Sequence, residues 1–443
     1  MQRSQVGKLA AIGVLLATAA CGGSSSGVGA ASGTAPTGGT ASSGGPTTSG
    51  GPTTSGGAVK IGAILSLSGV YSTLGPPEKN ALTMGLEALN KDGFVVDGKK
   101  YTMDVTIVDD KSDAATTGVS AFRQMTQSDK LPLIGFGLGS STYAPLLKRS
   151  PIPMVNILDS TSPSILKYDP HLFLTRGDSP TYVPGCLDYA KTKLNAKSVS
   201  IITAKGEPYA QGLTDLVKQS APGLGLTVGA TAEYPLGATD YGNAIRAAVA
   251  SKPDAIYLSS VTAVILPVLK QLRQSGYTGP VLHSSGVNPN QAKAILGANY
   301  NTIMKDNFDC AGTLPTTSEA PATQAFAKAY QTRWNEYPQD LTMWAYDFPF
   351  VVAEAMTKAG STSDSDKIFK ALPQISVPKG SISGWIPGDS GLLFTERGAR
   401  TSSEVTLWCP DKKTIASAMT FDTKNGKVVD QKLRDNPCSA ATS

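Results

Sequence analysis

The chain has 443 residues and a formal net charge of +5, with no run of basic residues. This mild balance excludes the electrostatic footprint of a nucleic-acid-binding protein. Behind a leader and a low-complexity segment, about 385 residues remain, which is more than one hydrophobic core usually organises, so two lobes are expected. The longest apolar stretch among them, 261–269, is too short to cross a membrane as a helix.

Residues 1–20 are predicted to be a secretory signal peptide, because two cationic residues precede an apolar segment too short to span a bilayer. Its loss lowers the net charge from +5 to +3. The sequence ATAAC at 17–21 resembles the lipobox of bacterial lipoproteins, although Thr18 stands where leucine is preferred. The resemblance implies that Cys21 becomes a lipid-bearing, palmitate-carrying first residue on the outer face of the cell membrane. The alternative is an ordinary cleaved signal followed by an unmodified cysteine.

Residues 21–57 are predicted to form a disordered tether behind the lipid anchor. Nearly all of 22–57 is Gly, Ser, Thr, Ala or Pro, and the hexad SGGPTT occurs twice. Such a segment cannot bury a core, and its r.m.s. reach is about 30 Å. The alternative is a glycosylated stalk, which leaves the function of the body unchanged.

Four further cysteines lie in the body: Cys186, Cys310, Cys409 and Cys438. An even number in an exported chain is consistent with two disulfides, and three pairings are open. The chain has no CxxC pair and only two histidines, so a structural zinc site is not expected.

The body alternates apolar runs with helical patterns. Its first part is predicted to hold strands at 58–67, 103–108, two within 131–163 and 171–175, and helices at 76–91 and 113–128. After a break at 177–180, strands are predicted at 198–203, 227–234, 255–259 and 280–283, and helices at 209–220, 241–250 and 263–274. Two long helical segments, 319–337 and 341–358, precede a strand-rich end. Two runs of β-α units imply two parallel-sheet lobes.

Hydroxyl-rich loops follow the third and fourth predicted strands. Residues 139–142 read GSST and residues 159–162 read DSTS. In an open α/β sheet, ligands bind beyond the carboxyl ends of the strands, where small hydroxyl residues leave room and offer donors. The stretch 131–163 is therefore predicted to hold something small and polar.

Seven motifs in order resemble the extracytoplasmic solute-binding proteins of ABC transporters, within the branched-chain amino-acid binding group of the type I periplasmic-binding fold. They are KIGAILSLSG, GLEALNKDG, VDDKSDAATT, SSTYAP, DSTSPSIL, EPYAQGL and WAYDFPFVVAEAM. The resemblance implies an α/β fold of two Rossmann-like parallel-sheet lobes joined by a three-strand hinge. It implies a first lobe of 58–177 plus about 312–390, a second of 178–311 plus about 391–430, and a tail at 431–443.

In that family the first lobe binds the ligand carboxylate through hydroxyls and backbone N–H groups. The resemblance assigns this role to Ser140 and Ser141 in one loop and to Ser160 and Thr161 in the other. Several short-range donors and the partial positive charge of a helix N-terminus suit a carboxylate. The alternative is that these residues are N-caps of the following helices, and both roles are compatible.

The second lobe departs from the family pattern. Tyr209 and Tyr71 fall at aromatic positions of the family, the alternative being surface aromatics. The glutamate that meets the ligand ammonium has no counterpart, and Ser285 stands in its place. Thr262 lies in the loop where a bulky aromatic residue is common.

Without that glutamate, the ammonium of an amino acid would lack its usual partner, and burying it unpaired would be costly. Either Asp159 takes the role from the first lobe, or the ligand is not an α-amino acid. Asp159 is equally readable as an N-cap with an exposed charge.

The resemblance implies the substrate-binding lipoprotein of an ABC importer, which captures a small polar solute between closing lobes and delivers it to a membrane permease. The solute would be a branched-chain amino acid or a related amide or carboxylate, and the protein a monomer without a cofactor. The alternative is a ligand-sensing lipoprotein of the same fold without a transport role.

An enzyme is not expected. The body has no GxSxG or HExxH motif. The sequence GFGLGS at 135–140 lacks the third glycine of a dinucleotide fingerprint and follows the third strand rather than the first.

Overall fold

The computed structural model describes residues 54–157, 170–175, 179–284, 286–287, 289–310, 320–339, 342–383, 392–394, 402–408, 413–421 and 428–434. The predictions for the signal peptide, Cys21, most of the tether, Cys409 and Cys438 concern residues outside these ranges. No helix of the described ranges is both long and apolar enough to cross a membrane.

The first sheet has six strands in the order β2-β3-β1-β4-β5-β6. Their bounds are β1 Thr54–Leu65, β2 Phe94–Val96, β3 Lys99–Asp109, β4 Ile134–Phe136, β5 Met154–Asn156 and β6 Leu172–Leu174. Every neighbouring pair is parallel except β2 with β3. The carboxyl ends of five strands therefore lie along one edge of this sheet.

Helices cover both faces of the first sheet. They are α1 Gly75–Asp92, α2 Val119–Arg123, α3 Ser140–Leu147, α11 Pro321–Trp334, α12 Thr342–Ala359 and α13 Ser365–Ala371. One core joins the sheet to α1, α11, α12 and α13, and a second joins it to α2 and α3. Helices from late in the chain thus pack on a sheet whose strands all come from its first part.

The second sheet has eight strands in the order β14-β13-β12-β11-β10-β9-β7-β8. Their bounds are β7 Ser198–Lys205, β8 Thr227–Pro235, β9 Ala255–Ser259, β10 Val281–His283, β11 Asn307–Asp309, β12 Ser402–Trp408, β13 Lys413–Phe421 and β14 Val428–Leu433. Strands β7 to β11 are parallel, and β12 to β14 continue the sheet in antiparallel fashion. The predicted α/β architecture with two mainly parallel sheets is confirmed.

Helices also cover both faces of the second sheet. They are α5 Ser179–Thr192, α6 Pro208–Ser220, α7 Gly242–Ala250, α8 Thr262–Gln274, α9 Pro289–Leu296 and α10 Tyr300–Met304. One core contains side chains of α7 to α10, and the other contains side chains of α5 and α6.

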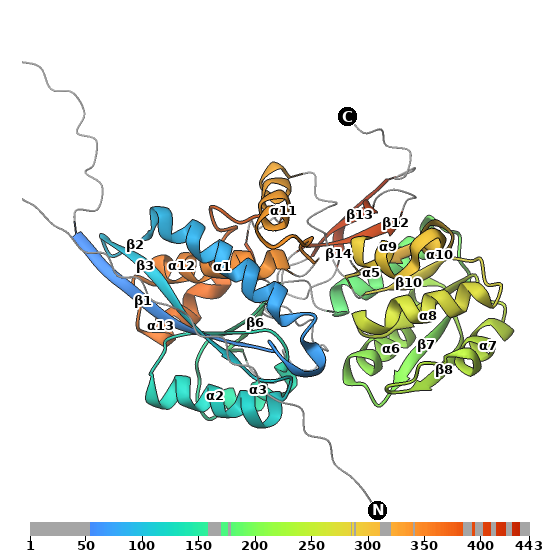
Figure 1. Cartoon of the computed structure of the whole chain (residues 1–443), viewed down its shortest axis with the longest axis horizontal. Helices are drawn as coiled ribbons and strands as arrows, with labels where there is room; N and C mark the ends of the chain where they lie inside the picture. Colours follow the sequence, from blue (N-terminus) through green and yellow to red (C-terminus); the bar gives the residue numbers. More distant parts are fainter. Residues whose placement is uncertain are drawn as a thin grey trace, which may run out of the picture. The chain divides into compact units, whose positions relative to one another are not determined.

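Helices α1 and α12 lie side by side (Figure 1). Two prolines open α1 and pre-set its first turn, and Gly93 ends it at φ 64°. Its buried residues recur at helical spacing and include Ala81, Gly85 and Leu89. A Cβ added at Gly85 would lie 2.1 Å from the carbonyl oxygen of Tyr346 in α12. Only glycine allows the two backbones to approach this closely.

The structure corrects several predicted boundaries. Residues 54–57, predicted as tether, belong to β1, because their backbone pairs with 99–101 of β3. Strand β14 runs to Leu433, inside the predicted tail. Leu393 and Phe394 pack in the core of the first sheet, although the prediction places residues from about 391 in the second lobe. The helix predicted at 113–128 is the short α2 flanked by π-helical turns.

Candidate functional site

The first hydroxyl-rich loop leads directly into α3. Gly139, at φ 98°, is the N-cap residue of this helix, and no side chain of the described residues caps it. Ser140 is the first helical residue and is buried, whereas Ser141 is the second and is exposed. The alternative interpretation of these two serines as N-caps is therefore wrong. The helix N-terminus lies at the carboxyl edge of the sheet, where its N–H groups favour an anion.

The ends of β1 and β5 add buried polar groups to this edge. The side-chain amide of Asn156 donates to the carbonyl oxygen of Gly137 over 3.0 Å, and the Asn156 carbonyl accepts from the Thr175 hydroxyl over 2.7 Å. Asn156 Oδ1 and Ser66 Oγ are buried without a hydrogen-bond partner among the described residues. Buried oxygens usually have a partner. The edge therefore offers acceptors as well as donors.

Asp109, at the end of β3, organises the loop that contains Tyr71. Its carboxylate accepts from the Ser68 hydroxyl over 2.7 Å and from three backbone N–H groups at 2.8 to 3.2 Å. The Ser112 hydroxyl extends this link, because it donates to the Ser68 carbonyl over 2.6 Å and accepts from the Tyr71 N–H over 3.0 Å. Tyr71 is half-buried and held by its backbone at this edge.

These contacts make Asp109 a source of pH-dependent stability. Burial is the largest single effect and raises the pKa of Asp109, but the Ser68 hydroxyl and the backbone N–H groups together outweigh it and lower the pKa. A carboxyl with a lower pKa in the folded state stabilises that state above about pH 4, and this stabilisation disappears as the pH falls further. We expect Asp109→Asn to lower the urea midpoint at pH 7, and the gap to wild type to shrink at about pH 3.

The matched control for this prediction is Asp104→Asn, on the same strand, where the side chain is exposed. Its urea midpoint should follow wild type at both pH values. If the difference in urea midpoint between Asp109→Asn and wild type is the same at both pH values, the ionised carboxylate does not have the role assigned to it.

Glu78, in the first turn of α1, is a polar residue of this edge that the sequence analysis missed. Its side chain is 2% exposed, and a Cβ added at Gly137 would lie 3.0 Å from Glu78 Oε2. The carboxylate therefore lies against the backbone at the end of β4. From the sequence alone, an acidic residue in the first turn of a helix is expected to be solvated and to interact favourably with the helix dipole. No feature of the sequence therefore predicts that Glu78 is buried.

Tyrosine and serine hydroxyls gather at the carboxyl edge of the second sheet. Tyr209 lies in the first turn of α6 and is half-buried. Its hydroxyl oxygen lies 2.5 Å from the carbonyl oxygen of Ser284 and 3.1 Å from the hydroxyl of Tyr182. Tyr182 in turn lies 3.0 Å from the hydroxyl of Ser179, at the start of α5.

Ser284 also forms a hydrogen bond with Tyr257 of β9, through its side-chain hydroxyl. The two hydroxyl oxygens are 2.5 Å apart, and Tyr257 is fully buried. Burial raises the pKa of Tyr257 far above its ordinary value, so this hydroxyl is neutral at physiological pH.

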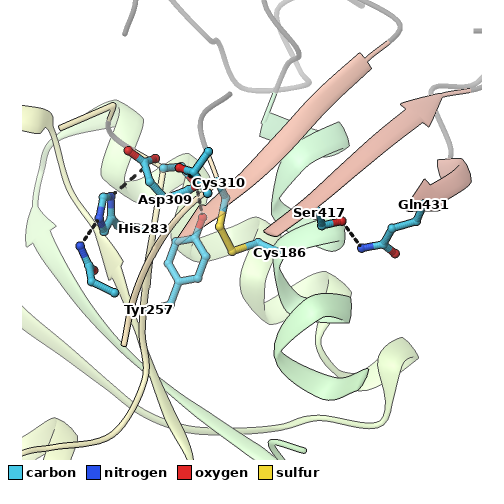
Figure 2. Close-up of a disulfide and its surroundings, with 10 residues drawn as sticks. Cys186, Tyr257, His283, Asp309, Cys310, Ser417 and Gln431 are labelled. Atoms are coloured by element: carbon cyan, nitrogen blue, oxygen red, sulfur yellow. Dashed lines mark hydrogen bonds and ion pairs between the residues drawn. A yellow bond between two sulfur atoms is a disulfide. The ribbon is translucent and has the colours of Figure 1, made fainter. Parts of the chain in front are cut away.

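A disulfide and a buried contact between a histidine and an aspartate lie next to this edge (Figure 2). Cys186 of α5 is bonded to Cys310, which follows β11, with 5.8 Å between the Cα atoms. Of the three possible ways to pair the four cysteines, only one includes this bond. His283 Nδ1 lies 3.7 Å from Asp309 Oδ1, and Asp309 Oδ2 accepts from the Val287 N–H over 3.2 Å. The buried carboxylate at this edge is therefore already engaged within the sheet.

Thr262 is the first residue of α8 and is half-buried. Nearby, the Ser260 hydroxyl lies 2.6 Å from that of Tyr234. Burial raises the pKa of Tyr234 to about 12, against the lowering effect of the Ser260 hydrogen bond. Tyr234, on β8, is therefore neutral at physiological pH, and the Ser260 hydroxyl beside it is buried.

The predicted site residues fall into three groups. Tyr71, Ser140 and Ser141 lie at the carboxyl edge of the first sheet. Tyr209 and Thr262 lie at that of the second. The remaining four lie outside the described residues: Asp159, Ser160, Thr161 and Ser285. Within the part of the chain that the structure describes, no group of three or more His, Cys, Asp or Glu residues could hold a metal ion.

Residues 58–392 match a family model described as periplasmic binding protein. The Leu/Ile/Val-binding protein homolog 3 of Brucella melitensis is 24% identical to this chain over 311 residues, which make up 69% of this chain and 80% of that relative.

Solved structures with the same fold include a leucine binding protein from Thermotoga maritima. It has a TM-score of 0.67 and 22% identity, and the match covers 82% of this chain and 99% of that one. The substrate-binding protein of a branched-chain amino acid transporter from Streptococcus pneumoniae, in complex with isoleucine, has a TM-score of 0.64 and 20% identity. That match covers 85% of this chain and 99% of the other.

Proposed function

Because this chain belongs to the periplasmic binding protein family, we propose that it is the substrate-binding lipoprotein of an ABC importer. It captures a branched-chain amino acid, or a related amide or carboxylate, between two lobes that close on a hinge and hands it to a membrane permease. The family consists of binding proteins and not of enzymes. The lipid on Cys21 keeps the protein on the outer face of the membrane, and the tether leaves the body free to reorient.

The observation that supports this proposal most is the chemistry of the two carboxyl edges. The first sheet offers the N-terminus of α3 with Ser140 and Ser141, which suits a carboxylate. The second offers hydroxyl groups, including that of Tyr209. The proposed ligand contacts are Tyr71, Ser140, Ser141, Asp159, Ser160, Thr161, Tyr209, Thr262 and Ser285.

Thermal unfolding with and without candidate solutes tests the proposal. Leucine, isoleucine and valine are each expected to raise the midpoint, because a ligand at 100 times its Kd stabilises the folded state by about 2.7 kcal/mol. Lysine and aspartate, which carry a charged side chain, serve as control solutes and should leave the midpoint unchanged. Calorimetric titration then gives the affinity. If none of the three branched-chain amino acids shifts the midpoint, the proposed ligand class is wrong.

A further inference from the structure

The side chains of a histidine, an aspartate and an asparagine meet at the ends of β10 and β11 (Figure 2). His283 lies opposite Asp309 in the register of the two strands, and Asn307 lies two residues before Asp309, so the three side chains share one face of the sheet. All three are fully buried. His283 Nδ1 lies 3.7 Å from Asp309 Oδ1, and His283 Nε2 lies 3.0 Å from Asn307 Nδ2. Each ring nitrogen therefore faces a polar group in the interior.

The contact with Asn307 belongs to the neutral form of the ring. An amide nitrogen donates and cannot accept, so Nε2 accepts this bond and the ring proton is on Nδ1. Asn307 Oδ1 is buried without a hydrogen-bond partner among the described residues, which is unusual for an amide oxygen. A proton taken up from solvent by Nε2 would make that nitrogen a donor, and a flip of the amide would then present Oδ1 as its acceptor. Asn307 can therefore bind both the neutral and the charged ring.

Asp309 connects the ring to the segment that follows β10. Its Oδ1 faces His283 Nδ1, and its Oδ2 accepts from the N–H of Val287 over 3.2 Å. Within this segment, Ser284 directly follows His283, and its hydroxyl lies 2.5 Å from that of Tyr257. A charged ring attracts a buried carboxylate much more strongly than a neutral ring does. Proton uptake therefore draws the carboxylate towards His283 and weakens its bond to Val287.

The other titratable groups around the ring lie elsewhere or are neutral. Those on the described side chains of α8, α9, α10, β9 and β12 are Lys270, Arg273, Lys293, Tyr300 and Tyr257. Lys270 and Lys293 are exposed, and Arg273 donates to backbone carbonyl oxygens of the residues before β11. Burial raises the pKa of Tyr257 far above its ordinary value, so its hydroxyl keeps its proton. Within the described ranges, Asp309 is the acidic group within 4 Å of the ring.

We infer that His283 is a proton switch of the second sheet's carboxyl edge: proton uptake shifts Asp309 from the segment after β10 to the charged ring and weakens ligand binding. The inference rests on the proposed function, because it assigns a regulation to the same binding edge. The element with two arrangements consists of the Asn307 amide and the Asp309 carboxylate. Histidine changes its charge between about pH 5 and 8, so an exported protein can meet both states as its surroundings acidify.

The first test follows the two ring nitrogens of His283 directly. The chain has two histidines, so ¹⁵N-labelled histidine gives two sets of ring signals, and His171→Gln assigns them. We expect the His283 ring to carry its proton on Nδ1 at about pH 8 and to become charged as the pH falls to about 5. A ring that keeps one form over this range, or that carries its proton on Nε2 at about pH 8, overturns the inference.

The second test measures the affinity for leucine by calorimetry at about pH 7.5 and pH 5.5. Wild type is expected to bind leucine about five-fold more weakly at the lower pH, and His283→Gln should show less than about a two-fold difference between the two. The matched control, His171→Gln, should keep the pH dependence of wild type. Because coupling is reciprocal, saturating leucine should lower the titration midpoint of His283 in wild type by about 0.7 pH units. This last measurement needs no substitution of a buried residue.

The outcomes separate the switch from the proposed function. If wild type binds leucine equally well at both pH values, or if His283→Gln keeps the full pH dependence, the proposed function stands and the switch falls. A titration midpoint of His283 that leucine leaves in place has the same consequence. If leucine, isoleucine and valine bind at neither pH while His283 titrates, the proposed ligand class is wrong, and the coupling to it falls as well.

Discussion

Removal of the Cys186–Cys310 disulfide is expected to lower the free energy of unfolding by about 4 kcal/mol. The two cysteines are 124 residues apart, so the bond closes a long loop and strongly restricts the unfolded chain. Both side chains are fully buried, and alanine is the replacement that adds no polar group. Urea unfolding of Cys186→Ala/Cys310→Ala against the oxidised wild type measures the difference.

The control is the same measurement in the presence of a reductant. The reductant should lower the midpoint of wild type towards that of the double variant and leave the double variant where it was. A double variant as stable as oxidised wild type would contradict the pairing. A further large loss for the double variant in reductant would show that another disulfide carries the stability.

The substitution Gly85→Ala is expected to destabilise the protein by about 3 kcal/mol, the upper end of the usual cost of overpacking. Its Cβ would lie 2.1 Å from the Tyr346 carbonyl oxygen and 3.0 Å from the Tyr346 Cα. These are backbone atoms of α12, so no side chain can rotate away and the helices must separate. Helix propensity alone predicts the opposite sign, a gain of about 1 kcal/mol for alanine in a helix.

Gly223→Ala is the matched control for Gly85→Ala. A Cβ added at Gly223 meets no atom within 4 Å, and its backbone is not in the left-handed region. The control variant should be as stable as wild type or slightly more so. If thermal unfolding places Gly85→Ala level with Gly223→Ala, the close approach of α1 and α12 is not a determinant of stability.

Periodicity and turn residues predict the regular parts of the two sheets. The strands of 198–283 appear at the expected places because β-branched apolar runs end at clear turn signals. Helix α5 was missed because Pro184 lies inside it and Gly185 follows, and such residues usually interrupt helices. Strands β2 and β14 were missed because the first has three residues and the second is largely polar.

The candidate site could be predicted only where a family motif marks it. Tyr209 stands in such a motif, whereas Tyr182 lies on a helix that the sequence did not predict and reaches its partner 27 residues away. The burial of Glu78 depends on the end of β4, which no local pattern in α1 encodes. Long-range side-chain contacts of this kind are fixed by tertiary packing and not by local periodicity.

The discontinuous core of the first sheet also sets an order of events in folding. The inner face of α1 is covered by α12, and Tyr346 is synthesised more than half the chain later than Gly85. Closing so long a loop costs entropy before any contact repays it, so such a core forms slowly. Strands β7 to β11 follow one another along the chain, and no strand of the first sheet comes between them. They are therefore free to pair earlier. The newly exported chain must therefore keep the apolar stripe of α1 from aggregating until nearly all of the protein has crossed the membrane.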